Sequence, residues 1–262
     1  MRNYRNLADI AGSVFAFESH LGVASASNLC TGWTDTLTGS ALVAAQGTPT
    51  KQPAYTASNA NFQGYPTIDW PLARVADQIY LETAVFASSI AKTLTFIAAI
   101  RCTDISVGRI IMNNRFPTTF NANMVIPAGN VGVIRLTGSG APAMNSVNGA
   151  IRVNETCVVV GLFNSMGRVF VNGKFCGTGT LGVNNMDALR IGNTGFDTGS
   201  LPFVGAMAAI GGWTRELGMG EIQRATTMLL RRYNPSLLAS RTAKTRTVLP
   251  APGLVGGRSR IL

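Results

Sequence analysis

The chain has 262 residues, of which 46% are hydrophobic and only 13% are charged. This length is sufficient for one large domain with a sizeable buried core. The 29 glycines and the few charged residues favour packed sheets joined by turns, and they exclude a coiled coil and a disordered chain. Lys and Arg (22) outnumber Asp and Glu (12), which gives a formal net charge of +10.

Four cysteines lie far apart without paired spacing, and His20 is the one histidine of the sequence. This pattern argues against a zinc site, and we expect no cofactor. The first ten residues include Asp9 and lead into Gly and Ser, so we expect no signal peptide. No stretch reaches the roughly 18 apolar residues of a membrane span. We therefore expect synthesis in a cytoplasm, free thiols and no membrane partner.

The predicted strands are short, rich in apolar and β-branched residues, and separated by Gly, Asn, Ser and Pro. The clearest one, at residues 93–101, places four apolar side chains on one face: Leu94, Phe96, Ala98 and Ile100. We predict that this face is core and that the other face is half exposed. Further strands are expected at residues 14–18, 67–70, 108–112, 131–136, 188–192 and 204–213.

Residues 157–163 and 168–172 predict a β-hairpin with a four-residue loop. This register places five side chains on one surface of the sheet: Val158, Val160, Leu162, Val169 and Val171. Asn172-Gly173 predicts the next turn. Cys157 and Cys176 would then be diagonal neighbours roughly 7 to 8 Å apart, which is too far for a disulfide. Such strands and turns together predict an antiparallel sandwich or jelly roll.

One helix is predicted, with Gly218 as its N-cap, Glu221 in its first turn and an end at Asn234-Pro235. Apolar residues recur along it at helical spacing: Ile222, Ala225, Leu229 and Tyr233. Residues 235–262 contain three prolines and three glycines without periodicity, and they predict an extended basic arm.

From residue 222 to 262 there are eight basic residues and no acidic one. Five of these basic residues lie in the arm and are predicted to anchor it on a partner: Arg241, Lys244, Arg246, Arg258 and Arg260. Apolar residues between them suit a protein surface, whereas nucleic acid would favour interleaved aromatics, so we favour a protein partner. Residues 1–11 form a second, shorter arm with the same two alternatives.

A series of motifs follows in the order typical of one fold. They are Gly32-Trp33-Thr34-Asp35, Pro53-Ala54-Tyr55, Gly64-Tyr65-Pro66-Thr67-Ile68, the strand at 93–101, the hairpin ending at Asn172-Gly173, Leu189-Arg190-Ile191-Gly192, and Ile210-Gly211-Gly212-Trp213 leading to Leu230-Arg231-Arg232-Tyr233. Over residues 12–234 they resemble the concanavalin A-like, laminin-G-like jelly-roll domain of the kind found in bacteriophage structural proteins. The resemblance implies an all-β, concanavalin A-like antiparallel β-sandwich with one C-terminal helix, between arms at 1–11 and 235–262.

Such domains occur in lectins, glucanases, bacterial surface proteins and phage structural proteins, so the fold does not decide the function. A retaining glucanase needs two carboxylates about 5 to 5.5 Å apart. Eight of the twelve acidic residues are candidates for such a pair, and all eight are isolated in the sequence: Asp35, Asp69, Asp77, Glu82, Asp104, Glu155, Asp187 and Asp197. We therefore expect no enzyme, and His20 is interpreted as an ordinary core or surface residue.

Sugar binding needs only a few polar groups and an aromatic platform. Trp33, Trp70 and Trp213 are candidates for a glycan platform, although their place inside the fold motifs favours buried core. Asn193 and Asp197 could supply calcium ligands, and an ordinary polar turn is the favoured alternative.

These observations favour a non-enzymatic virion structural protein (capsid decoration, head-fibre or tail-associated), made in a host cytoplasm. Its arms would hold it on other virion proteins, and a homo-oligomer in the assembly is expected. The alternative is a carbohydrate-binding module that attaches to host surface glycans.

Overall fold

The computed structural model describes residues 4–38, 40–86, 93–114, 122–129, 132–138, 143–182, 186–193 and 201–239, without the side chains of 75–77. The predicted anchoring residues Arg241, Lys244, Arg246, Arg258 and Arg260 lie outside this part, as do Asp197 and residues 1–3 of the N-terminal arm.

The described part consists mainly of short strands. The strands are β1 (Ser13–Glu18), β2 (Val23–Ala26), β3 (Leu29–Thr34), β4 (Val43–Ala45), β5 (Ala54–Thr56), β6 (Thr67–Trp70), β7 (Leu81–Thr83), β8 (Leu94–Cys102), β9 (Arg109–Asn114), β10 (Asn123–Ile126), β11 (Arg135–Thr137), β12 (Met144–Asn145), β13 (Thr156–Phe163), β14 (Met166–Val171), β15 (Lys174–Thr180), β16 (Leu189–Ile191) and β17 (Gly205–Trp213). The helical elements are α1 (Met219–Tyr233) and four 3-10 turns, η1 (Leu7–Asp9), η2 (Pro49–Lys51), η3 (Ala60–Phe62) and η4 (Leu72–Asp77).

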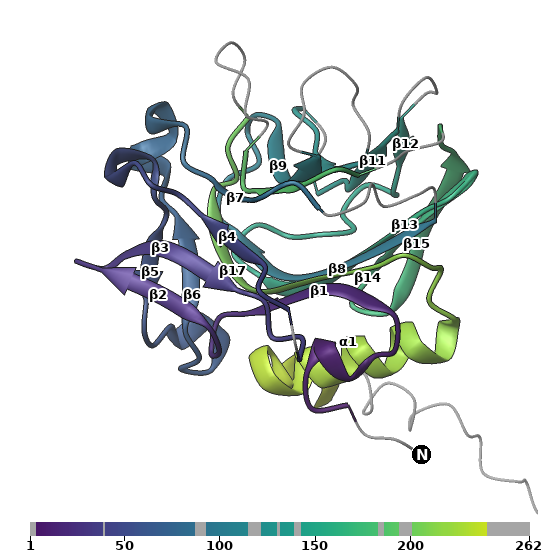
Figure 1. Ribbon diagram of the computed structural model, residues 1–262. Helices are drawn as coiled ribbons and strands as arrows, with labels where there is room; N and C mark the ends of the chain where they lie inside the picture. Colours follow the sequence, from purple (N-terminus) through teal and green to yellow (C-terminus); the bar gives the residue numbers. More distant parts are fainter. Residues whose placement is uncertain are drawn as a thin grey trace, which may run out of the picture.

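The strands form two antiparallel layers, with α1 against the outer face of the lower one (Figure 1). The lower layer follows the order β1–β17–β8–β13–β14–β15, and the upper one the order β4–β7–β16–β9–β10–β11–β12. Strands β2, β3, β5 and β6 link the layers at one end. The protein is thus an all-β antiparallel sandwich of the jelly-roll type, as the sequence predicted.

Two apolar cores lie on opposite faces of the lower layer. The first fills the space between the layers and includes Phe96 and Ile100 of β8. The second lies between the lower layer and α1, and it includes Ile97 and Ala99 of the same strand. The predicted alternation of β8 is confirmed, but its second face is buried instead of half exposed, because α1 covers the lower layer.

The predicted β13–β14 hairpin exists in a different register. Val159 pairs with Val171 and Val160 with Phe170, whereas a four-residue loop would shift each pair by one residue. Since a shift of one residue exchanges the two faces of a strand, Val158, Val160 and Leu162 face α1 and not the inter-layer core. Val169 and Val171 face the inter-layer core, so the predicted grouping of these five side chains was wrong.

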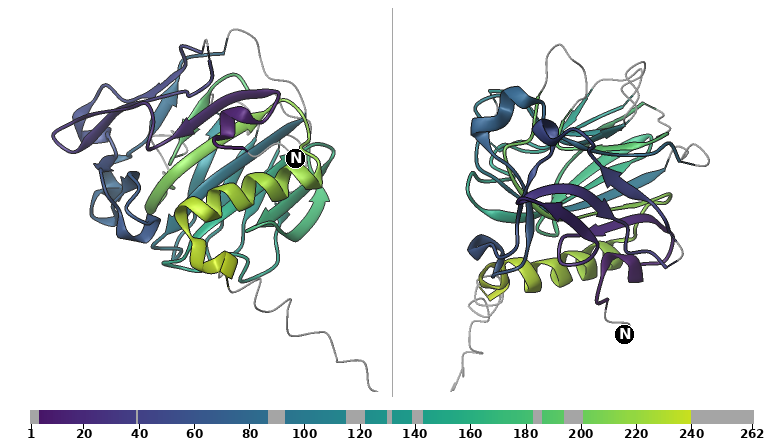
Figure 2. Two further views of the ribbon diagram at one scale, coloured as in Figure 1. Left: turned by 90° about the horizontal axis from the view of Figure 1, so that it is seen from below. Right: turned by 60° about the vertical axis from the view of Figure 1, so that its left-hand side comes forward.

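Helix α1 begins where the sequence predicted. The backbone N–H of Gly218 donates to the Glu221 carboxylate at 3.0 Å, which stabilises the first turn. Residues 235–239 are also helical and remain on the domain, with Leu237 and Leu238 partly buried against the second core. The prediction of an extended arm from residue 235 is therefore wrong for its first five residues, which are helical because two leucines pack against the domain. The views from below and from the side show this turn at the end of α1 (Figure 2).

Candidate functional site

The three tryptophans proposed as a glycan platform belong to the core. Trp33 and Trp213 are 0% exposed and Trp70 is 1% exposed. Trp70 packs edge-on against Phe203, and the indole N–H of Trp213 donates to the carbonyl of Ile10 at 3.2 Å. None of the three rings offers a face to a sugar at the surface, because the two layers and α1 enclose them.

The described carboxylates are mostly engaged in structural contacts. Five of them form ion pairs with arginines: Glu18 with Arg232, Glu82 with Arg190, Asp104 with Arg109, Glu216 with Arg168 and Glu221 with Arg215. Asp35 accepts from backbone N–H groups, and Asp69 accepts from Thr56 and Thr67. Within the described residues, no three His, Cys, Asp or Glu side chains are grouped so that they could hold a metal ion.

A polar row crosses the outer face of the upper layer. Pairing of neighbouring strands aligns Glu82, Arg190 and Asn113 in one row, on the face opposite the inter-layer core. The Arg190 guanidinium lies 4.4 Å from the ring centre of Tyr80 and 2.6 Å from the Glu82 carboxylate. Arg190 is 9% and Asn113 4% exposed, so this row is closed to a large ligand in the structure.

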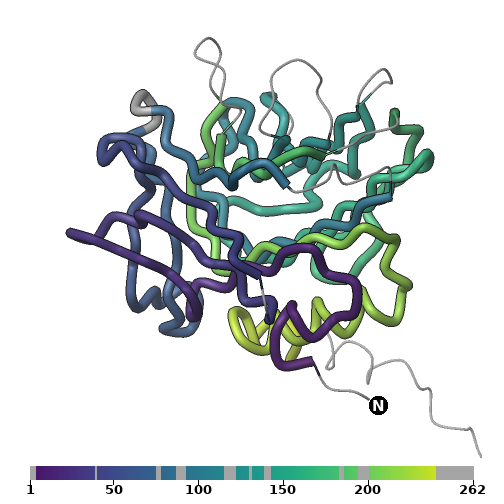
Figure 3. The backbone as a smooth tube through the Cα atoms, viewed as in Figure 1, coloured from purple at the N-terminus to yellow at the C-terminus, as the bar shows by residue number. Residues whose placement is uncertain are grey.

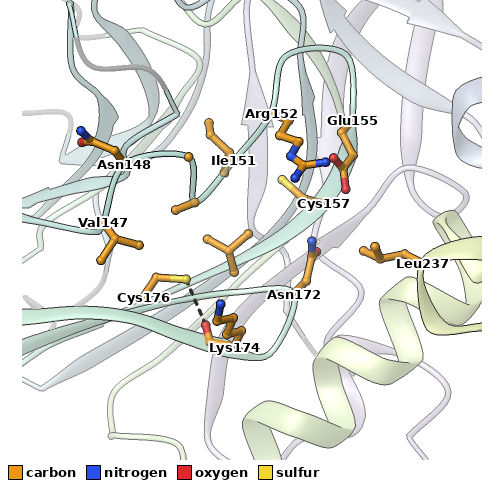
Figure 4. Close-up of a pocket in the computed structure, with 13 residues that line it drawn as sticks. Val147, Asn148, Ile151, Arg152, Glu155, Cys157, Asn172, Lys174, Cys176 and Leu237 are labelled. Carbon is orange, nitrogen blue, oxygen red and sulfur yellow. Dashed lines mark hydrogen bonds between the residues drawn. The ribbon is translucent and has the colours of Figure 1, made fainter. Parts of the chain in front are cut away.

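An open pocket of about 430 Å³ lies at one edge of the sandwich, between the segment 147–155 and the β13–β14–β15 strands (Figure 4). This volume falls within the range of small-ligand sites. Its base is apolar and consists of Ile151, Cys157, Val171, Cys176 and Leu237. Its rim is polar and includes Asn148, Arg152, Glu155, Asn172 and Lys174.

Backbone hydrogen bonds hold the segment 147–155 over the strands. The N–H of Val147 donates to the carbonyl of Cys176, and the N–H of Asn154 donates to that of Cys102, both at 2.8 Å. Asn154 takes the left-handed backbone conformation, with φ of 65°, which Asn tolerates better than most residues. The upper wall of the pocket is therefore tied to the sheet at both ends.

The lower wall is fixed by the turn between β14 and β15. Asn172 and Gly173 have φ values of 53° and 76°, which suit a tight hairpin turn of the type that the sequence predicted. The Oδ1 atom of Asn172 accepts from the N–H of Val158 at 2.8 Å, so its Nδ2 group remains as a donor for the pocket. The carbonyl of Lys174 accepts from the Cys176 thiol at 3.2 Å, and the Lys174 side chain points upwards in the close-up view (Figure 4).

The pocket rim offers charges that the described residues do not neutralise. The side chains of Arg152, Glu155 and Lys174 form no ion pair or hydrogen bond within the described part of the chain. Arg152 reaches the pocket from above and Lys174 from below (Figure 4). The arrangement can therefore bind a small polar molecule through charge-assisted hydrogen bonds above an apolar base.

No direct sign of this pocket is present in the sequence. Its walls come from residues 147–157, 171–176 and 237, which meet only through the register of β13 to β15. Of the features predicted from the sequence, the Asn172-Gly173 turn is the one that forms part of the pocket. Of the predicted calcium ligands, Asn193 is buried at 1% exposure, and Asp197 lies outside the described residues.

Comparisons with known proteins agree with the fold. No family model matches the sequence, and no curated protein matches it. The binding domain of botulinum neurotoxin DC superposes with a TM-score of 0.53 in its complex with SialylT, at 12% identity over 85% of this chain and 52% of that one. Its complex with rat synaptotagmin II gives 0.54 at 11% identity, over 86% of this chain and 52% of that one.

A sialidase of Trypanosoma rangeli gives a TM-score of 0.51 at 14% identity, over 85% of this chain and 33% of that one. The chain thus spans about half of the toxin domain and a third of the sialidase. At such low identity the likeness shows the fold alone. In the described part of the chain, α1 and the other helices are too short or too polar to span a membrane.

Proposed function

We propose that this protein is a carbohydrate-binding domain whose ligand occupies the pocket between the segment 147–155 and β13 to β15. The observation that carries the proposal is the combination of an apolar base with a polar rim in which the side chains of Arg152, Glu155 and Lys174 have no partner among the described residues. Sugars present apolar ring faces and many hydroxyl groups. The apolar base can contact a ring face, and the polar rim can form hydrogen bonds with the hydroxyl groups.

The fold neighbours support this proposal over the alternatives. The toxin binding domain has been solved with SialylT, and five of the described carboxylates of the present chain are held in ion pairs with arginines. A binding role without catalysis therefore agrees with both the fold and the distribution of acids.

Binding of the full chain to an array of immobilised glycans tests the proposal. We expect one or a few related glycans to bind, and we expect no release of reducing sugar from them. Asn172→Asp keeps the acceptor for the Val158 N–H and removes the Nδ2 donor, so it should weaken binding while the turn persists. No binding to any glycan, or unchanged binding by this variant, would contradict the pocket as the site.

We also propose, as a second role, that the domain is held on a larger protein assembly by residues 240–262. The support is the run of basic residues without an acidic one from residue 222 to the C-terminus. A bacteriophage virion is the setting that the sequence resemblance suggests, with shell or tail proteins as partners. Co-sedimentation of the full chain, but not of a chain ending at Ala239, with such an assembly would test it.

A further inference from the structure

The charges around the pocket indicate which sugars it would accept. Two cationic side chains, Arg152 and Lys174, and one carboxylate, Glu155, line the rim, which gives a net charge of +1. Among the described residues, five other arginines are paired with acids, whereas Arg152 and Lys174 are not. The pocket therefore has spare positive charge.

The described residues of this site offer no aromatic ring for stacking. The lining residues include no Trp, Tyr, Phe or His, and the three tryptophans are buried elsewhere. Affinity must then come from hydrogen bonds, charge and the small apolar base. A neutral sugar would gain little from the two cations, since an unoccupied guanidinium binds a carboxylate much more strongly than a hydroxyl.

We infer that the pocket binds a sugar that carries a ring carboxylate, an inference that rests on the proposed function. The planar Arg152 guanidinium can donate two parallel hydrogen bonds to such a carboxylate, and Lys174 adds a second positive charge from the opposite wall. The Nδ2 group of Asn172 and the Glu155 carboxylate can bond the amide or hydroxyl groups of the ring.

The apolar base favours an additional feature of the ligand. Ile151, Cys157 and Val171 line the base of the pocket and contribute a small apolar area, because each is only 3% exposed. An acyl methyl group or the apolar face of the ring fits such a surface, and its burial would add to affinity. A bare inorganic anion would leave this surface unused.

The test compares acidic oligosaccharides, containing uronic or nonulosonic acids, with their methyl esters, in which the charge is removed and the rest is kept. Isothermal titration with the full chain should show binding of the free acid at least tenfold tighter than that of the ester. Raising the salt concentration should weaken the binding of the free acid more than that of the ester, because salt screens the attraction between exposed charges.

Matched variants identify the residues. Arg152→Ala and Lys174→Ala should each lower the affinity for the free acid about tenfold and leave the affinity for the ester nearly unchanged. Arg152→Lys keeps the charge without the planar fork and should recover only part of the loss. Arg231→Ala, an equal loss of charge at an exposed position on α1, should have no effect.

The outcomes separate the two proposals. Equal binding of acid and ester, with Asn172→Asp still weakening both, would overturn the acidic class and keep the proposed function. No binding of any sugar would overturn both. Acid preference that survives Arg152→Ala and Lys174→Ala would place the acidic site elsewhere. Thermal melting of each variant shows that a loss of binding is not a loss of fold.

Discussion

The carboxylate of Glu18, on β1, forms an ion pair with the guanidinium of Arg232, in the last turn of α1. Glu18 is 0% exposed and also accepts from the backbone N–H of Leu7, at 2.5 Å. Arg232 donates in turn to the carbonyl of Arg5. One buried pair therefore joins the N-terminal segment, β1 and α1, whose paths lie together in the backbone view (Figure 3).

Replacing Arg232 tests the importance of this pair. Burial raises the pKa of Glu18, although the Leu7 N–H and Arg232 act to lower it. Arg232→Met would leave a buried carboxylate without its cation, and we expect a loss of about 3 to 5 kcal/mol in the free energy of unfolding at pH 7. Urea denaturation measures it.

Arg231→Met is the matched control, because Arg231 is exposed on the same turn; its effect should stay within about 0.5 kcal/mol. The double variant Glu18→Gln/Arg232→Met should recover part of the loss. If the double variant is no more stable than Arg232→Met, the buried charge is not the cause.

The partly buried imidazole of His20 leads us to expect that the stability of the protein depends on pH. Burial, together with the charge of Arg232, lowers the pKa of His20 from 6.5 to about 4. Between these values the unfolded chain binds a proton that the folded chain does not, so the contribution of His20 to stability falls as the pH decreases from 6.5 to 4, whereas the raised pKa of Glu18 acts in the opposite direction. The effect is at most about 3 kcal/mol.

Urea denaturation at pH 7, 5.5 and 4.5 should show that the free energy of unfolding of the wild-type chain decreases relative to that of His20→Gln as the pH falls. Glu221, whose pKa the Arg215 hydrogen bond lowers to about 2, contributes mainly below pH 4.5, where its stabilisation is lost as the pH falls. An equal decrease in the His20→Gln variant would show that other groups are responsible.

The four cysteines are free and buried in the structure. Burial raises the pKa of Cys102 to about 11 and that of Cys30 to about 12, and it also raises that of Cys157. Since the thiolate is the reactive form, a thiol reagent at pH 8 should react slowly with the folded chain. After denaturation without reductant, four thiols should react. A count of two or none would reveal disulfides.

The sequence predicted the fold well because strand alternation and turn residues are local signals. It predicted β1, β6, β8, β17 and α1 within a few residues. The register of β13 and β14 was missed because one residue of loop length decides it, and periodicity does not show that residue. The second buried face of β8 depends on α1, which follows it by more than a hundred residues.

The candidate site was less predictable for the same reason. Cys157, Lys174 and Leu237 have no motif in common, and only the pairing of strands and the turn after α1 bring them to one pocket. The tryptophans, in contrast, have a strong local signal, and their burial agrees with the framework role that the sequence favoured.

The junction between α1 and the C-terminal segment gives the last prediction. Asn234 donates through Nδ2 to the carbonyl of Thr156 at 2.7 Å, and Leu237 and Leu238 pack partly buried against the second core. Leu237 also forms part of the pocket base. Residues 235–239 therefore belong to the domain, and the segment that follows should be dispensable for its stability.

A chain ending at Ala239 should keep a thermal midpoint within a few degrees of the full chain and should bind glycan equally well. A chain ending at Asn234 loses both leucines, and their partial burial corresponds to about 1 to 3 kcal/mol, so its midpoint should fall by several degrees. Its glycan affinity should also fall, because Leu237 is missing from the base of the pocket.

Leu238→Ala in the full chain, which leaves Leu237 in place, separates the two effects: it should lower the midpoint with little change in affinity. If the chain ending at Ala239 unfolded, the domain would extend beyond that residue; if the chain ending at Asn234 matched the full chain in both measurements, residues 235–239 would play no part in the fold or the pocket.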